Sequence, residues 1–237
     1  MRWQQIADDV ILMQYPFRVF GIDFARNVTL IRLNDGRLVI HSTAPFTSDD
    51  VAAIRDFGEP GWLVDASVMH DTFAKKGHAA FAQIPYLAPP GFGDASGVTT
   101  PPLYPPPNEW DGQIDVIPID GTRKHEHALF HRASRTLIVA DLVFSFPPDS
   151  GAWARFFVRN VMRLPRLRGI SVFFKMLISD RQAFERSMTK ILDLDFSRMI
   201  VGHREPIESD AKAVLLRALL DRGFRLDGDM ELPPARF

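Results

Sequence analysis

The sequence contains no cysteine among its 237 residues, and this absence removes several classes of chemistry at once. Disulfide bridges, thiolate nucleophiles and cysteine-based zinc fingers are all excluded. The charges nearly cancel, with a formal net charge of -1, so the composition gives no global argument for binding nucleic acid. No apolar run reaches the length of a membrane span, so we expect no transmembrane segment.

The N-terminus also lacks the uninterrupted apolar core of a signal peptide, because Asp8 and Asp9 lie within its first residues. We therefore expect a cytoplasmic protein. The sequence has no Gly-x-Ser-x-Gly elbow, no phosphate-binding P-loop and no dinucleotide fingerprint. The residues left for chemistry are seven histidines and the acids near them.

Two apolar segments that each carry one metal-competent side chain are the most informative feature. Residues 136–144 contain Asp141, and residues 199–207 contain His203. Both segments are predicted to be strands, and α/β proteins usually place their sites at strand ends. Neutral imidazole and ionised carboxylate are standard ligands of zinc and related divalent ions. The alternative for Asp141 is a salt bridge to an arginine, since a buried carboxylate needs a partner.

Further candidates follow the predicted strand at residues 62–64. His70 and Asp71 lie at the start of a predicted helix, where Asp71 is either a functional carboxylate or only a helix cap. His125 and His127 lie on one face of a strand, a spacing that can chelate a metal, although the charged residues beside them favour an exposed strand start.

Two stretches stand out by composition. Residues 151–180 interleave basic and aromatic side chains, including Arg155 and Arg159. Either the aromatics face the core and the arginines face solvent, or the stretch is a cap that receives an anionic, amphiphilic compound or touches an anionic membrane surface. Residues 89–109 are rich in proline, which predicts an extended surface loop or a rim over a site.

The order of these elements resembles the metallo-β-lactamase superfamily. An N-terminal hairpin, a strand leading into a polar helix start, a hairpin and a late strand follow one another over about residues 8–222. Residues 131–141 read HRASRTLIVAD and residues 195–203 read DFSRMIVGH, segments similar to those of an uncharacterised branch of that superfamily. The resemblance implies an α/β (α+β) fold, the four-layered αβ/βα sandwich. It further implies a single domain over 1–237, with a helical cap inserted at about 151–180 and a Pro-rich loop at about 89–109.

The resemblance also implies a degenerate metal site. The superfamily's His-x-His-x-Asp-His loop corresponds here to residues 66–71, where Ala66 and Val68 replace the first two histidines. The closing Asp-His pair is reversed, as His70-Asp71. A further family histidine has no clean counterpart, and His125 or His127 would replace it only with a shift of register. The first of two metal positions is thereby lost.

By the same resemblance the second metal position keeps Asp141 and His203 as ligands, with His70 and Asp71 completing the shell or acting as base. We therefore expect a hydrolase of a small ester, lactone or phosphoester that uses at most one divalent ion, zinc, iron or manganese. Arg155 and Arg159 would bind an anionic or amphiphilic substrate. The alternative is a non-catalytic protein of the same fold that holds no metal and binds such a ligand or a protein partner.

Overall fold

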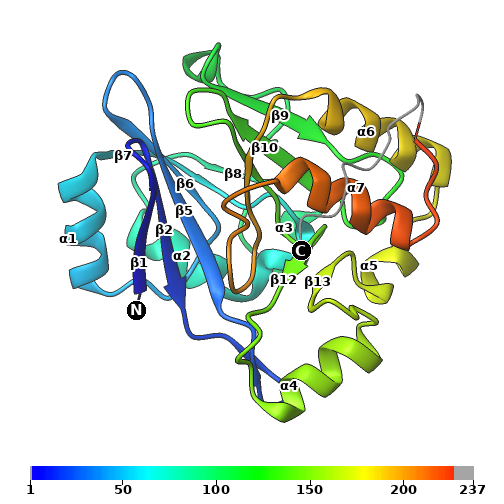
Figure 1. Ribbon diagram of the computed structural model, residues 1–237. Coiled ribbons are helices and arrows are strands. Elements are labelled where there is room, and N and C mark those ends of the chain that lie inside the picture. The colour runs from blue at the N-terminus through cyan, green and yellow to red at the C-terminus, as the bar shows by residue number, and fades with distance from the viewer. Residues whose placement is uncertain (1, 227–237) are drawn as a thin grey trace.

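Residues 2–226 are described by the computed structural model, and their N-terminal part builds a six-stranded sheet (Figure 1). Asn34-Asp35-Gly36 closes the predicted hairpin, and Gly36 adopts the positive φ of 87° that such a turn requires. The sheet order is β1 (Arg2–Ala7), β2 (Val10–Tyr15), β5 (Arg26–Arg32), β6 (Arg37–His41), β7 (Glu59–Val64) and β8 (Tyr86–Leu87). Strands β6, β7 and β8 pair in parallel.

The second sheet has four strands and comes from the C-terminal half. Its order is β14 (Arg198–Ile200), β11 (Thr136–Ile138), β10 (His127–His131) and β9 (Ile114–Pro118). Strands β11 and β14 are parallel neighbours, with Ile138 opposite Ile200. Because parallel strands run in the same direction, their carboxyl ends meet at one edge of the sheet. Asp141 follows β11 and His203 follows β14, so this pairing brings both residues to that edge.

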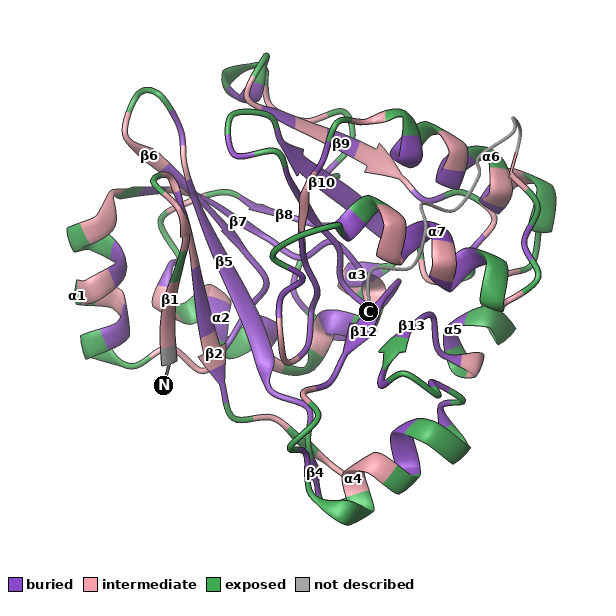
Figure 2. Ribbon diagram, in the orientation of Figure 1, coloured by how far each residue is buried: buried purple, intermediate pink, exposed green. Residues whose placement is uncertain are grey.

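Three hydrophobic clusters show that the two sheets and the helices form four layers. One cluster joins the inner faces of the sheets, for example Val39 and Trp62 to Leu129. A second packs the first sheet against α1 (Ser48–Phe57), and the third packs the second sheet against α6 (Arg181–Asp193) and α7 (Ala211–Asp221). Figure 2 shows the inner strands buried and the outer faces of α1 and α6 exposed. The predicted αβ/βα sandwich is confirmed.

The helices begin and end where local chemistry dictates. Thr47 caps α1: its hydroxyl accepts the backbone N–H of Asp50, while the Asp50 carboxylate accepts the N–H of Thr47. The predicted helix after β7 begins as a 3-10 turn, η1 (Val68–Phe73), which continues into α2 (Ala74–Ala80). Ser67 caps that turn. None of the helices in the described part of the chain has the length and apolar character that a membrane span requires.

The basic, aromatic stretch forms a small unit with its own core below the main sandwich (Figure 1). Its elements are α4 (Ala152–Phe156), the π-helical turn η3 (Phe157–Val161), β13 (Arg168–Gly169) and α5 (Val172–Met176), and α5 packs through Phe174 against the cluster of the second sheet. Strand β13 pairs with β12 (Phe144–Ser145). The hairpin of β3 (Arg18–Val19) and β4 (Ile22–Asp23) packs beside it, since Ile22 belongs to the same cluster as Phe157 and Met162.

The Pro-rich stretch is more ordered than its composition predicts. It contains the short helices α3 (Phe92–Ser96) and η2 (Asn108–Trp110). Phe92, Leu103 and Trp110 from this stretch are fully buried. The expectation of an extended path omitted these helices, because apolar anchors between the prolines gain more by packing on the sandwich than by remaining in solvent.

Candidate metal centre

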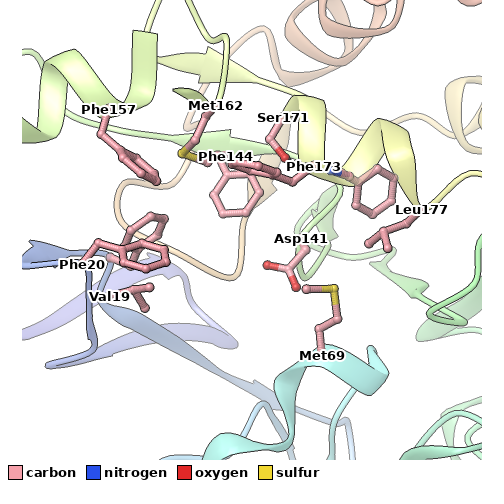
Figure 3. A pocket seen from close by; sticks show the side chains of 12 residues that line it. Val19, Phe20, Met69, Asp141, Phe144, Phe157, Met162, Ser171, Phe173 and Leu177 are labelled. Atoms are coloured by element: carbon pink, nitrogen blue, oxygen red, sulfur yellow. Dashed lines mark hydrogen bonds between the residues drawn. The ribbon is translucent and has the colours of Figure 1, made fainter. Parts of the chain in front are cut away.

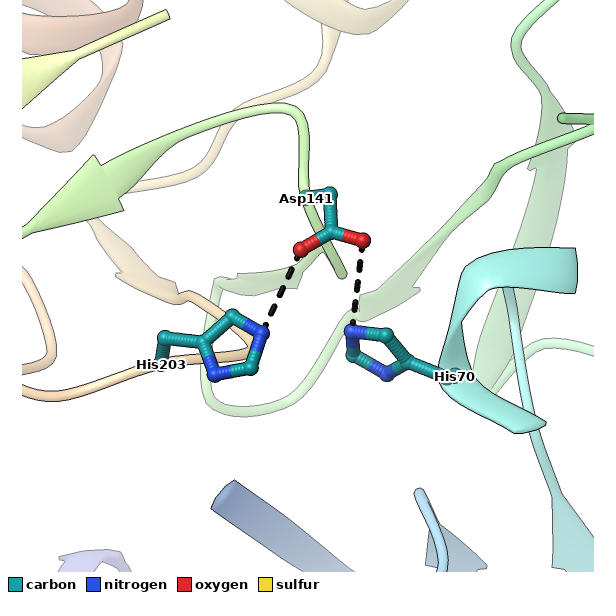
Figure 4. Close-up of side chains that lie close together, drawn as sticks. All are labelled: His70, Asp141 and His203. Carbon is teal, nitrogen blue, oxygen red and sulfur yellow. Dashed lines mark ion pairs between the residues drawn. The ribbon is translucent and has the colours of Figure 1, made fainter. Parts of the chain in front are cut away.

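His70, Asp141 and His203 converge at the sheet edge, and the two imidazoles approach the two oxygens of one carboxylate (Figure 4). His203 Nε2 lies 3.3 Å from Asp141 Oδ1, and His70 Nε2 lies 3.6 Å from Asp141 Oδ2. One ligand atom from each residue lies within 4.8 Å of the others. All three residues are buried, with at most 7 % of each exposed. Atoms that bind one ion at about 2 Å must be separated by roughly these distances.

Asp141 is positioned by the carboxylate of Glu126. The backbone N–H groups of Ala140, Asp141 and Leu142 all donate to Glu126, at 3.0 to 3.1 Å. Glu126 is 1 % exposed. Burial and the charge of Asp141 act to raise the pKa of Glu126, whereas the three backbone N–H donors act to lower it. The backbone of the turn after β11 is therefore held by a single side chain, Glu126.

His203 is held by the first sheet, far away in the sequence. Its Nδ1 donates to the backbone oxygen of Ala25 at 2.7 Å, which directs Nε2 toward Asp141. Asn27 donates through its side-chain amide to the backbone oxygens of Val201 and Arg204, and its own N–H donates to the oxygen of Gly202. The loop after β14 is thus tied to β5, and the imidazole has one fixed orientation.

His70 enters the centre from η1 and depends on a glycine opposite. A Cβ atom at Gly202 would lie 2.7 Å from His70 Cε1 and 2.6 Å from the Ala140 oxygen, so no other residue fits there without movement. His70 Nδ1 lies 3.4 Å from the Ser42 hydroxyl. Among residues 2–226, buried His70 Nε2 has no partner within hydrogen-bond distance, and Asp141 Oδ2 at 3.6 Å is its ion-pair neighbour. A ring nitrogen left unpartnered in the interior is costly unless something else binds it.

The protonation states suit metal ligands. Burial and the charge of Arg26 lower the pKa of His70 to about 4, despite the opposing charge of Asp141, so this imidazole is neutral at pH 7. Burial would raise the pKa of Asp141, but the neighbouring His70 and His203 outweigh it and hold that pKa well below its usual range. The centre therefore offers one carboxylate and a neutral imidazole at His70, the forms in which these side chains bind divalent ions.

A buried guanidinium lies beside this centre. Arg26 is 1 % exposed, and its guanidinium lies 5.4 Å from the ring centre of Phe17 and donates to the Ser42 hydroxyl at 3.3 Å. Burial lowers the pKa of Arg26, whereas the charges of Asp65, Asp141 and Asp71 act to raise it. Arginine keeps its proton in proteins, so a permanent positive charge remains close to Asp141.

The donor set fits one divalent ion. An ion at this position requires His203 and His70 to present unprotonated Nε2 atoms, and the acceptors for the Nδ1 hydrogens are the Ala25 oxygen and the Ser42 hydroxyl. Two imidazoles and a carboxylate leave room for water or substrate, as in catalytic zinc sites and mononuclear iron sites. An ion would account best for His70 Nε2, which is buried and lies 3.6 Å from the Asp141 carboxylate, slightly too far for a hydrogen bond.

The other predicted ligands lie outside this group. In the described part of the chain, Asp71, His125 and His127 are not among the residues whose ligand atoms converge. Asp71 lies close enough to the buried Arg26 for its charge to raise the pKa of that guanidinium. His127 Nδ1 instead contacts the backbone oxygen of His125. Ala66 is fully buried, and its oxygen accepts the N–H of His127.

Sequence reasoning missed the residues that orient the ligands. The sequence patterns described above single out none of Glu126, Arg26, Asn27 and Ser42. One signal was present: Glu126 and Arg26 are charged residues at the ends of apolar strands, and such residues need buried partners.

Comparisons with known proteins support the fold through structure alone. No protein-family model matches the chain, and no curated protein matches it by sequence. A metallo-β-lactamase from Pontibacter korlensis matches with a TM-score of 0.62 at 11% identity, over 93% of this chain and 99% of that one. A metallo-β-lactamase from Erythrobacter litoralis matches with a TM-score of 0.60 at 13% identity, over 92% and 89%.

A third solved structure, a fragment of a diflavin flavoprotein from Nostoc sp., matches with a TM-score of 0.65 at 15% identity, over 93% of this chain and 94% of that one. The chain therefore has the metallo-β-lactamase fold. At these identities the likeness covers the fold, and the activity has to be argued from the residues of the centre.

Proposed function

We propose that the chain is a hydrolase of a small ester, lactone or phosphoester, working with one divalent metal ion bound by His70, Asp141 and His203. The observation that carries the proposal is the convergence of these three buried ligands, with His70 Nε2 and His203 Nε2 both directed at the Asp141 carboxylate. Zinc, iron and manganese are all compatible with two imidazoles and a carboxylate. When bound, such an ion polarises a carbonyl or phosphoryl oxygen and lowers the pKa of water.

The residues of the chain supply orientation for this chemistry. Glu126 fixes the turn that carries Asp141, and Ala25 and Asn27 fix the loop that carries His203. We propose that Asp71, adjacent to His70 in the chain, accepts a proton during the reaction. Arg155 and Arg159 do not line the apolar pocket beside Asp141. We propose that they bind an anionic group of the substrate outside that pocket.

The second candidate is a non-catalytic protein that binds a ligand or a partner without metal, and one observation favours it. The Arg26 guanidinium is buried close enough to act on the pKa of His70, and a permanent positive charge there weakens the binding of a divalent cation. In this alternative Arg26 neutralises Asp141 in place of a metal ion.

Elemental analysis of the protein purified without a His-tag or chelator separates the two candidates. The hydrolase predicts close to one zinc, iron or manganese per chain, lost in Asp141→Ala and His203→Ala and kept in the control His78→Ala. A panel of esters, lactones and phosphoesters is then assayed, with Asp71→Asn expected to keep the metal but lose activity. A wild-type protein that takes up no metal even from excess ion would contradict the hydrolase and support the second candidate.

A further inference from the structure

An apolar pocket opens directly beside the candidate metal centre (Figure 3). It encloses about 270 Å³, close to the lower end of small-ligand pockets at about 300 Å³. Its walls come from β3, the turn after β11, the basic aromatic unit and Met69 of η1. Ten of its twelve lining residues are apolar, and Phe144, Phe157 and Phe174 are among them. The pocket therefore offers a ligand almost nothing but hydrocarbon contact.

The polar residues of the wall are Asp141 and Ser171. Asp141 belongs to both the pocket and the candidate metal centre, so a molecule in the pocket extends from the ligand atoms into apolar surroundings. The Ser171 hydroxyl accepts the backbone N–H of Phe174 at 3.0 Å and still has its own hydrogen to donate. In the described part of the chain, no arginine or lysine lines the pocket. An anionic group inside it would face Asp141 without a cation of the wall to offset the repulsion.

Large apolar side chains at the mouth of the pocket are exposed to solvent. Phe20 is 74% exposed, and Met69 and Phe173 are each 44% exposed. All three line the pocket. Single exposed apolar residues are common, but several around one opening beside a cluster of ligands indicate a surface that a bound molecule covers. The pocket thus has a polar end at Asp141 and an open, apolar end at these three side chains.

We propose that this pocket binds a neutral acyl or aryl chain of the substrate, and that the substrate is therefore an ester or lactone with an apolar tail whose carbonyl group lies at Asp141. The position of the reacting carbonyl group rests on the proposed function, whereas the binding of the apolar tail rests on the pocket alone. Hydrolysis of such an ester consumes one water, breaks the bond between the carbonyl carbon and the alkoxy oxygen, and releases a carboxylic acid and an alcohol.

We expect the affinity of the pocket to depend on the length of the ligand's alkyl chain. Burying one methylene is worth about 0.8 kcal/mol, so each added methylene should tighten binding about fourfold until the cavity is full. Butanol, hexanol and octanol are suitable probes because they are neutral and need neither metal nor hydrolysis. We expect their affinities for the full-length protein, measured by calorimetry, to rise steeply along this series.

Two variants locate the binding. Phe173→Ala removes part of the pocket wall and should weaken octanol binding at least fivefold, and Val19→Trp should abolish it by filling the cavity. Met176→Ala is the matched control, because Met176 lies on the same helix and is 61% exposed but does not line the pocket. Affinities that do not depend on chain length, or an equal loss in Met176→Ala, would overturn the inference.

A parallel series of nitrophenyl esters of increasing acyl length separates this inference from the proposed function. Hydrolysis of the acetate and octanoate esters with equal kcat/KM, and no octanol binding, would overturn the pocket assignment and leave the hydrolase standing. Chain-length-dependent octanol binding without hydrolysis of any ester would support the pocket as a ligand site and contradict the hydrolase. A kcat/KM that rises from acetate to octanoate and falls again in Phe173→Ala supports both.

Discussion

The Glu126 carboxylate accepts the backbone N–H of Asp141 with both of its oxygens, at 3.0 and 3.1 Å. Glu126 thus orients Asp141 through its backbone: it holds the main chain so that the Asp141 carboxylate faces His70 and His203. Neither residue is exposed by more than 7 %. The arrangement makes the geometry of the centre depend on a residue that would not itself bind the ion.

The variant Glu126→Ala tests this dependence. It leaves the N–H groups of Ala140, Asp141 and Leu142 buried without an acceptor, at about 1 kcal/mol or more for each. We expect a loss of about 3 kcal/mol or more in the free energy of unfolding, measured by urea denaturation. Metal affinity should also fall by roughly 10-fold to 100-fold, the usual effect of removing a residue that orients ligands.

Glu59→Ala is the control for Glu126→Ala, since Glu59 is exposed at the start of β7. It should change neither stability nor metal content. A folded Glu126→Ala protein with the stability and metal affinity of the wild type would show that the turn after β11 keeps its shape by itself.

Gly202→Ala tests the close approach of His70 to the loop after β14. The added methyl group would meet His70 Cε1 at 2.7 Å and the Ala140 oxygen at 2.6 Å, so the loop or the imidazole has to move. We expect weaker metal binding and a loss of about 1 to 3 kcal/mol in stability, as for other overpacked sites. Gly151→Ala is the matched control because nothing lies within 4 Å of its Cβ position. Equal metal affinity in the two variants would contradict the steric argument.

His41 makes stability depend on pH. It is 1% exposed, and neither ring nitrogen has a hydrogen-bond partner among residues 2–226. Burial together with the charges of His70 and Arg26 lowers its pKa to about 3. The unfolded chain takes up a proton at His41 as the pH falls through about 6.5, but the folded protein does not do so above about 3. The unfolded state binds more protons in this window, so the free energy of unfolding decreases as the pH is lowered.

From pH 7 to pH 5, His41 should account for about 2 kcal/mol of this loss. Other groups titrate in the same range, so the informative quantity is the difference between the wild type and His41→Leu in urea denaturation at the two pH values. The leucine variant should lose about 2 kcal/mol less than the wild type on acidification. Equal losses in both proteins would mean that His41 is already protonated in the folded state, or is solvated there.

Several elements were predictable because their signals are local. The Asn34-Asp35-Gly36 turn defines the hairpin of β5 and β6, and Thr47 defines the start of α1. Alternating turn and apolar segments marked the strands that carry Asp141 and His203. The prediction of an extended Pro-rich loop was incomplete for the opposite reason, because Phe92 and Trp110 are ordered by contacts with distant parts of the chain.

Residue types and their positions establish which side chains are available to bind a metal: histidine and aspartate at strand ends, no cysteine, and no histidine at positions 66 and 68. Which of these side chains meet depends on how the chain folds. Strands β11 and β14 are about 60 residues apart in the chain, and their parallel pairing, not any local pattern, brings Asp141 to His203. Ala25 and Asn27, which orient His203, lie at the start of β5 in the other sheet, and Ser42, which contacts His70, follows β6 about 28 residues earlier in the chain. Side-chain identity is a local property, whereas convergence depends on how two sheets pack, and packing is set by the whole core.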